Sequence, residues 1–242
     1  MSAARFTPSS ATLSSAFEAP RLVLFDCDGT LVDSQHHIVA AMQAAFARHG
    51  LAAPAPDAVR RLVGLPLEIS VRQLLQAMGI GTDADAVVAA YREAAFAMRH
   101  APDHDEPLFP GLVDALARLE DDGYLLGIAT GKARRGLDAT LSLHGLHDRF
   151  VTLQTADIAR GKPDPDMVLR AMRETGAEPG STLVVGDTTF DIQMAKNAGV
   201  RALGVAWGYH DPAELLEAGA LAVAQSYGEV PALIRAALGA GF

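Results

Sequence analysis

The sequence predicts an α/β fold, a doubly wound parallel sheet with an inserted all-helical segment. Two observations lead to this prediction. Short apolar runs alternate with longer segments of helical spacing that end at glycine, and the interval from 35 to 104 has amphipathic segments but no strand pattern. Strands that alternate with helices favour a parallel sheet that is covered by helices on both faces.

Six apolar runs are the expected strands, and the helical segments between them end near glycines, which adopt the left-handed C-terminal conformation easily. A last helix is expected from about Val230. The expected strands cover residues 22–25, 124–129, 150–154, 182–185, 202–207 and 221–224. This order of elements predicts a Rossmann-like core.

The interval 35–104 predicts an inserted helical cap domain. Ile38, Met42 and Phe46 recur at helical spacing, and a structureless loop of this length would be unusual in a compact protein. The polar, proline-rich stretch 101–111 is typical of a domain boundary. The expected division is a loose N-terminal tail (1–20), a core (21–34 and 105–242) and the helical cap (35–104).

Composition excludes several classes of partner. The formal net charge is -9 and the 20 basic residues form no long run, so nucleic acid is not an expected partner. No stretch approaches the roughly 20 apolar residues of a membrane span, so no membrane partner is expected. A single cysteine, Cys27, fits a cytoplasmic protein. The expected partner is a small molecule, and both a monomer and a homodimer stay open.

Two carboxylates directly follow the first strand, in the stretch LVLFDCDGTLVDS. Asp26 and Asp28 are two residues apart, so both would point to the same side of an extended chain, and Cys27 between them would point into the core. Two unit charges about 4 Å apart repel by roughly 4 kcal/mol at an effective dielectric constant of about 20. The pair therefore needs a cation, a shared proton or water.

Polar residues also follow three other strands, and the carboxyl ends of parallel strands collect at one edge of a sheet. They are Thr130, Lys162, Asp187 and Asp191. Each alone has an ordinary explanation, such as a helix cap or a solvated lysine. Together with the first pair they would form a costly negative cluster unless a divalent cation bound there, and carboxylate oxygens suit Mg²⁺.

These stretches carry a family resemblance. DCDGT (26–30), TGK (130–132), GKPDPD (161–166) and GDTTFD (186–191) resemble, in order, the four signature motifs of the haloacid dehalogenase (HAD) superfamily. The resemblance covers essentially all of the chain after residue 20 and includes a helical cap after the first motif. Within the superfamily the sequence is most similar to the phosphoglycolate phosphatase-like branch.

The resemblance implies a role for each acid. Asp26 is the implied nucleophile that forms an aspartyl-phosphate, and Asp28 the implied general acid and base. Because Asp28 must gain and lose a proton, its pKa is expected to be raised. Asp26, Asp187 and Asp28, the last through its main-chain carbonyl, are the implied Mg²⁺ ligands, while Asp191 is expected to orient Asp187 or a water from the second layer.

The same resemblance implies the phosphate-binding groups. Thr130 and Lys162 are expected to hold the phosphoryl oxygens, together with main-chain amides around Gly29 and of Gly131.

The implied function is a magnesium-dependent phosphatase for a small phosphomonoester such as 2-phosphoglycolate. The acid Asp28 disfavours dehalogenation, since a departing halide needs no proton. A phosphomutase of the β-phosphoglucomutase type, a pyrophosphatase and a non-catalytic phospholigand-binding module stay open.

The loop 63–67 of the expected cap is a candidate for substrate selection. Arg60 or Arg61 just before it could pair with a substrate carboxylate, or both could be solvated helix residues. His36 and His37 are expected to be hinge residues.

Overall fold

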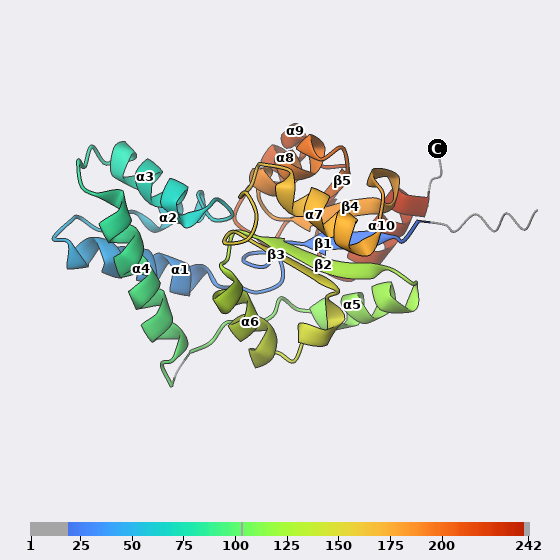
Figure 1. Ribbon diagram of the computed structural model, residues 1–242, viewed down its shortest axis with the longest axis horizontal. Coiled ribbons are helices and arrows are strands. Elements are labelled where there is room, and N and C mark those ends of the chain that lie inside the picture. The colour runs from blue at the N-terminus through green and yellow to red at the C-terminus, as the bar shows by residue number, and fades with distance from the viewer. Residues whose placement is uncertain (1–18, 103, 240–242) are drawn as a thin grey trace, which may run out of the picture.

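The structure is a computed structural model in which residues 19–102 and 104–239 are described. Helices α1–α4 lie together at one end of the molecule, and the sheet with its covering helices forms the other (Figure 1). The expected loose tail, residues 1–20, lies almost entirely outside the described residues. The domain boundaries given above stay a prediction.

The six strands form one parallel sheet in the order β3-β2-β1-β4-β5-β6, which confirms the predicted fold class. The strands are β1 (Leu22–Phe25), β2 (Leu125–Thr130), β3 (Thr152–Thr155), β4 (Thr182–Gly186), β5 (Arg201–Val205) and β6 (Val223–Ala224). The expected strand at 202–207 extends too far, because the pairing of β5 with the short strand β6 stops at Val205 and Ala224. The one expected at 150–154 begins too early, since Phe150 still belongs to a 3₁₀ turn (His147–Arg149) as its C-cap.

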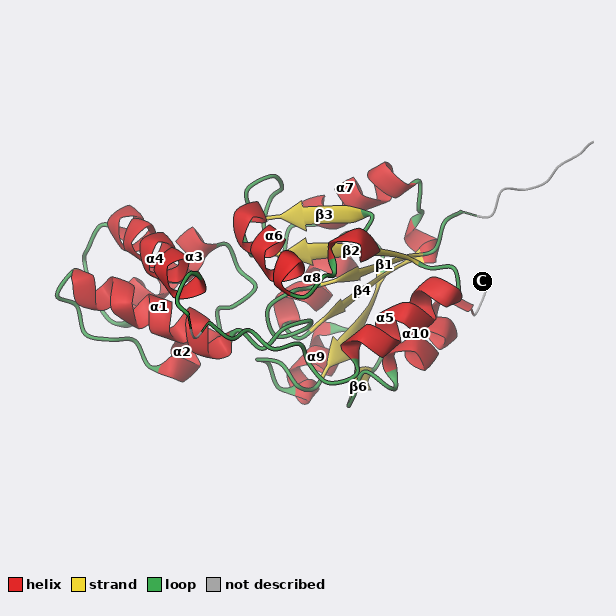
Figure 2. Ribbon diagram, turned by 90° about the horizontal axis from the view of Figure 1, so that it is seen from below, coloured by secondary structure: helices red, strands yellow, loops and turns green. Residues whose placement is uncertain are grey.

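The two faces of the sheet pack against different helices, as Figure 2 shows. Alternate residues of β1 point to opposite faces: Val23 and Phe25 belong to one apolar cluster, Leu22 and Leu24 to the other. The first cluster includes residues of α5 (Leu112–Asp121), α6 (Arg134–Leu143) and α10 (Val230–Gly239), the second residues of α7 (Asp166–Thr175), α8 (Thr189–Asn197) and α9 (Pro212–Ala218). Burial on both faces explains the continuous apolar run of β1.

The segment between β1 and α5 is helical wherever it has regular structure. Its helices are α1 (Gln35–Arg48), α2 (Pro56–Arg60), α3 (Leu67–Ala77) and α4 (Ala84–Arg99). They share their own apolar cluster, which includes Met42, Phe46, Val71, Leu74 and Val87. No helix in the described part of the chain combines the length and apolar composition needed to cross a membrane.

Candidate active site

The first aspartate lies directly beyond β1, the strand between β2 and β4. The Asp26 amide donates to the Val185 carbonyl at 2.9 Å, so the nucleophile predicted from the sequence is fixed to the sheet. Cys27, the next residue, is fully buried in the core, as predicted, and burial raises the pKa of its thiol.

Three carboxylates meet at this edge of the sheet. Oxygens of Asp26, Asp187 and Asp191 all lie within 4.8 Å of one another, and all three residues are buried. The ammonium of Lys162, itself buried, lies 2.8 Å from Asp26 Oδ1 and 2.6 Å from Asp191 Oδ1. The predicted site residues from three strand ends therefore form one cluster with a single lysine inside it.

The charge of this cluster is not balanced by protein groups alone. Burial raises the pKa of Asp26 to about 6; the Lys162 ammonium opposes this rise and the Asp191 carboxylate adds to it. Burial, followed by the charges of Asp191 and Asp26, raises the pKa of Asp187 well above its ordinary value. One ammonium among three buried carboxylates leaves negative charge that a divalent cation with oxygen ligands would neutralise. The donor set therefore fits Mg²⁺.

Hydrogen bonds from neighbouring residues orient two of these acids. Asp187 Oδ1 accepts from the Thr30 hydroxyl at 2.8 Å, and its Oδ2 accepts from the Tyr209 amide at 2.9 Å. Asp191 Oδ2 accepts from the hydroxyl and the amide of Thr188, at 2.7 and 3.1 Å. Asp191 lies in the first turn of helix α8, the ordinary role considered for it in the sequence, and forms a capping box with Thr188.

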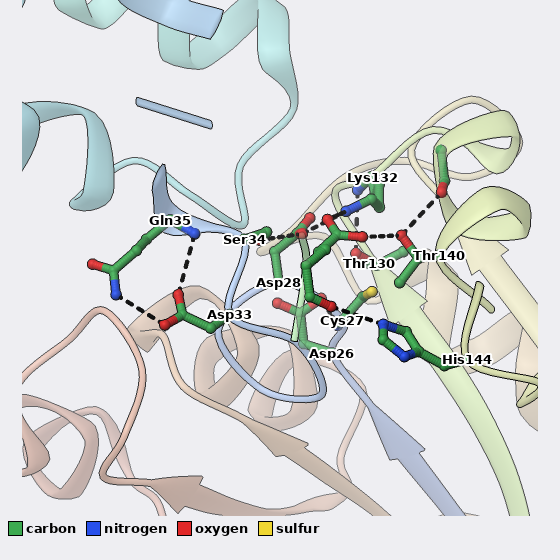
Figure 3. A network of polar contacts seen from close by, with 12 residues as sticks. Asp26, Cys27, Asp28, Asp33, Ser34, Gln35, Thr130, Lys132, Thr140 and His144 are labelled. Atoms are coloured by element: carbon green, nitrogen blue, oxygen red, sulfur yellow. Dashed lines mark hydrogen bonds and ion pairs between the residues drawn. The ribbon is translucent and has the colours of Figure 1, made fainter. Parts of the chain in front are cut away.

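Asp28 has a different set of contacts. Its Oδ1 accepts from the Ser34 hydroxyl and from the Lys132 ammonium, each at 2.6 Å (Figure 3). Burial, the largest single effect, raises the pKa of Asp28, but the Lys132 ammonium, the Ser34 hydroxyl and the Lys162 ammonium together lower it below its ordinary value. The expectation of a raised pKa at Asp28 is therefore wrong for this structure, because a direct ion pair between Lys132 and Asp28 was not expected from the sequence. The metal contact predicted for Asp28 involves its main-chain carbonyl and stays a prediction.

Glu106 completes the environment of Lys132. The Lys132 ammonium lies 2.9 Å from Glu106 Oε1, and the Thr140 hydroxyl donates to Glu106 Oε2 at 2.6 Å. His144 Nε2 lies 2.7 Å from the main-chain carbonyl of Glu106. Sequence analysis missed Glu106, which is one acid among several in the expected boundary stretch; its 4% exposure, the only feature that distinguishes it, is a tertiary property.

The predicted phosphate-binding residues fall into three groups. Thr130 and Gly131 line a cavity together with Asp26 and Asp28. Lys162 contacts Asp26 but is not among the residues that line this cavity. Gly29 requires a correction: its amide already donates to the Val32 carbonyl at 2.9 Å and is not free for phosphate.

Gly29 has a steric role instead. Its φ is +84°, and an added Cβ would lie 2.3 Å from Asp187 Oδ2. Only glycine combines this left-handed conformation with such a close approach of the loop after β1 to Asp187.

The loop after α2 packs directly on the core. An added Cβ on Gly131 would lie 2.8 Å from the Gly64 carbonyl oxygen, and one on Gly161 would lie 2.2 Å from Pro66 Cγ.

The arginines before this loop do not line the cavity. Arg61 makes two hydrogen bonds of 2.5 and 2.6 Å to Glu214 of α9.

Arg60 pairs with Asp57 on its own helix. The expectation that one of these arginines meets a substrate carboxylate is therefore not supported by the arrangement of their side chains.

The two neighbouring histidines of the expected hinge differ in surroundings. His37 lines the cavity, and its Nε2 lies 3.3 Å from Nδ1 of His104, in the stretch that returns from α4 to the core. His36 is exposed. The imidazoles of His37 and His104 therefore join the two crossings between the helical segment and the sheet.

Comparison with known proteins agrees with this geometry. The family described as haloacid dehalogenase-like hydrolase matches residues 23–205. Among curated relatives, a probable phosphatase named IndB from Dickeya dadantii is 40% identical over 214 residues, covering 86% of this chain and 91% of its own. Phosphoglycolate phosphatase 1 from Pseudomonas aeruginosa is 35% identical over 201 residues, covering 81% and 72%.

Solved structures have the same fold. The crystal structure of a hydrolase from Pseudomonas syringae superposes with a TM-score of 0.76 at 27% identity, covering 86% of this chain and 94% of that one. The resemblance inferred from the four motifs is thereby confirmed. The chain belongs to the haloacid dehalogenase-like hydrolase family.

Proposed function

We propose that this protein is a magnesium-dependent phosphatase that hydrolyses a small phosphomonoester through an aspartyl-phosphate. The observation that carries the proposal is the position of Asp26. Asp26 lines the cavity, Lys162 lies 2.8 Å from its Oδ1, and Asp28, two residues away, lines the same cavity. A nucleophile and a second acid at one cavity, with a cation in contact with the nucleophile, suit covalent phosphoryl transfer.

The proposed chemistry has two steps. In the first, an Asp26 oxygen attacks phosphorus, the bond from phosphorus to the alcohol oxygen breaks, and Asp28 in its protonated form gives a proton to the departing alkoxide. In the second, Asp28 takes a proton from water, the water oxygen attacks phosphorus, and the bond to Asp26 breaks to release inorganic phosphate. Thr130 and the amide of Gly131 line the cavity and would hold the phosphoryl oxygens.

The proposed Mg²⁺ ligands are Asp26, Asp187 and the main-chain carbonyl of Asp28. Asp191 would orient Asp187 or a metal-bound water without binding the metal itself. Bound Mg²⁺ reduces the repulsion between the anionic substrate and the carboxylate of Asp26. Lys162 is shared between Asp26 and Asp191, and its ammonium partly compensates the charge of these two buried carboxylates.

Helices α1–α4 are the proposed cap, inserted at 35–104 into a core formed by 21–34 and 105–242. The loop that contains Gly64 and Pro66 touches the motif glycines Gly131 and Gly161, so the cap would exclude water from the phosphoryl group. The names of the relatives make 2-phosphoglycolate the first substrate to examine.

The test is phosphate release from 2-phosphoglycolate, sugar phosphates, nucleotides and pyrophosphate, with and without Mg²⁺. Release that requires Mg²⁺ and is lost in Asp26→Asn supports the proposal. Isomerisation of a sugar phosphate without net phosphate release would instead identify a mutase, and exclusive hydrolysis of pyrophosphate a pyrophosphatase. If neither phosphate release nor isomerisation is seen, and Asp26→Asn binds phosphate esters as tightly as the unaltered protein does, the protein is a phospholigand-binding module.

A further inference from the structure

We propose that the alcohol portion of the substrate is a bulky, mostly apolar group that occupies the space between helices α1, α3 and α4. This inference rests on the proposed phosphatase function and specifies its substrate class. Its basis is a cavity of about 440 Å³ that begins at Asp26 and Asp28 and continues into the helical segment.

The part of the cavity wall supplied by the helical segment carries many large apolar side chains. They come from α1, from the loop after α2, from α3 and from α4, and include Ile38, Met42, Leu62, Leu74, Tyr91 and Phe96. Several of these belong to the apolar cluster of the helical segment itself. The cavity therefore reaches into the core of this segment, where a hydrated polar group would lose its water without compensation.

The size of the cavity exceeds what a two-carbon acid needs. Pockets of about 300–1,000 Å³ enclose most of the surface of drug-sized ligands, and their walls are mainly apolar with a few polar groups that fix orientation. At about 440 Å³ this cavity lies inside that range. A phosphoryl group with a two-carbon tail would leave much of the apolar wall in contact with water.

Tyr91 supplies one orienting polar group. Its side chain lines the cavity, and its hydroxyl has no hydrogen-bond partner among residues 19–102 and 104–239. Burial and the nearby charge of Asp28 raise the pKa of Tyr91 to about 12, so the hydroxyl stays a neutral donor. It can donate to an oxygen of the leaving group close to the phosphoryl end.

Four lysine and arginine residues line the cavity, and two of them are paired with carboxylates. Lys132 is paired with Asp28 and Glu106, and Arg92 with Glu68. Arg99 and Arg135 have no carboxylate partner within the described ranges, and the Arg135 guanidinium lies 4.3 Å from the centre of the Phe96 ring.

Helices α1, α2 and α3, which supply much of the wall, contribute no lysine or arginine to it. The competing possibility is an anionic leaving group, such as glycolate, held by Arg99 or Arg135. The extent of apolar wall favours the apolar group, and experiment separates the two.

The first experiment uses alkyl phosphates whose leaving groups have similar basicity: methyl, propyl, butyl, hexyl and 2-phenylethyl phosphate, beside 2-phosphoglycolate, all with Mg²⁺. We expect kcat/KM to rise about fourfold per methylene, the equivalent of about 0.8 kcal/mol, until the cavity is full. We also expect 2-phenylethyl phosphate to exceed 2-phosphoglycolate. A flat series, or a preference for 2-phosphoglycolate over butyl phosphate that is lost in Arg99→Gln or Arg135→Gln, overturns the inference while leaving the phosphatase function intact.

A second experiment fills the cavity. Ala95 lines it and Ala97, on the same helix, is exposed and does not, so Ala95→Phe and Ala97→Phe are a matched pair. We expect Ala95→Phe to lower kcat/KM for 2-phenylethyl phosphate about tenfold or more, with methyl phosphate changed less than about twofold, since the added ring takes volume that only the larger ester needs. Equal effects of both variants, or equal effects on both esters, contradict the inference.

Binding without turnover separates the inference from the proposed function. Titration of the Mg²⁺-loaded protein with methylphosphonate and hexylphosphonate measures the same preference without hydrolysis. If no ester is hydrolysed, the phosphatase function fails, and tighter binding of hexylphosphonate, weakened by Ala95→Phe, would still support the apolar site. Equal affinities for the two phosphonates would overturn it.

Discussion

The ammonium of Lys132 lies 2.6 Å from Asp28 Oδ1 and 2.9 Å from Glu106 Oε1. One cation thus joins the loop after β1, the loop after β2 and the stretch that returns from the helical segment. All three side chains are largely buried, so each charge depends on the others for compensation. The position of the proposed acid and base is therefore coupled to the junction between the two parts of the molecule.

Replacing Lys132 by Met should destabilise the protein and impair turnover. Loss of the ammonium leaves two buried carboxylates without a counter-charge, a type of change that typically costs about 3–5 kcal/mol in the free energy of unfolding. Urea unfolding measures this cost. Lys196→Met, at an exposed lysine, is the control and should stay within about 0.5 kcal/mol. A similarly small change in Lys132→Met would show that the ion pairs of Lys132 with Asp28 and Glu106 contribute little to stability.

Asp187→Asn and Asp191→Asn should weaken Mg²⁺ binding to different degrees. Asp187 is a proposed Mg²⁺ ligand, so its replacement should lower the affinity more. Asp191 is proposed to orient the ligands without binding the metal, and replacing a residue of that kind typically lowers metal affinity about 10–100-fold. Calorimetric titration with Mg²⁺ gives both affinities. Asp148→Asn, at an exposed acid, provides the baseline. A larger loss in Asp191→Asn would make Asp191 the direct ligand.

Gly161→Ala should reduce activity through the position of the loop after α2. The added Cβ would lie 2.2 Å from Pro66 Cγ, so this loop must move away from the core. Displacements of about 1 Å at a substrate-enclosing element can lower kcat/KM about 100-fold. Gly180→Ala is the matched control, because nothing lies within 4 Å of its added Cβ. Equal activity of the two variants would show that closure of this loop does not limit turnover.

The imidazole of His104 should titrate below the ordinary value of 6.5. Burial, the adjacent His37 and the cations Arg99 and Lys132 all lower the pKa of His104, while Glu106 raises it. NMR titration of the imidazole protons measures this pKa, which should rise in His37→Gln.

The effect on stability has a definite sign. As the pH falls below about 6.5, the unfolded chain binds this proton before the folded chain does, so the contribution of His104 to stability is lost at acidic pH. Thermal unfolding between pH 7 and 5 should show a smaller loss in His104→Gln than in the unaltered protein. An equal loss in both would assign the acid sensitivity to other groups.

The sequence by itself determined the class of fold and the main members of the candidate site. Apolar runs and helical spacing are local properties, and in a parallel sheet the residues that follow each strand must collect at one edge. Asp26, Asp187 and Asp191 could therefore be placed together, and the structure places their oxygens within 4.8 Å of one another. Strand ends were less accurate, because a strand stops where its pairing with a neighbouring strand stops, as β5 does at Val205 beside β6.

Only the tertiary structure decided which charges compensate one another. Lys132 is 104 residues from Asp28 and 26 from Glu106, and no local pattern encodes either pair. The lowered pKa of Asp28 depends on the first pair, so the sequence alone led to the wrong direction. The hydrogen bond that occupies the Gly29 amide and the apolar wall of the cavity were also not expected from the sequence. Hydrogen-bond partners and cavity walls depend on how distant segments pack. The sequence determines which side chains are present, whereas the electric field at each ionisable side chain depends on the folded chain.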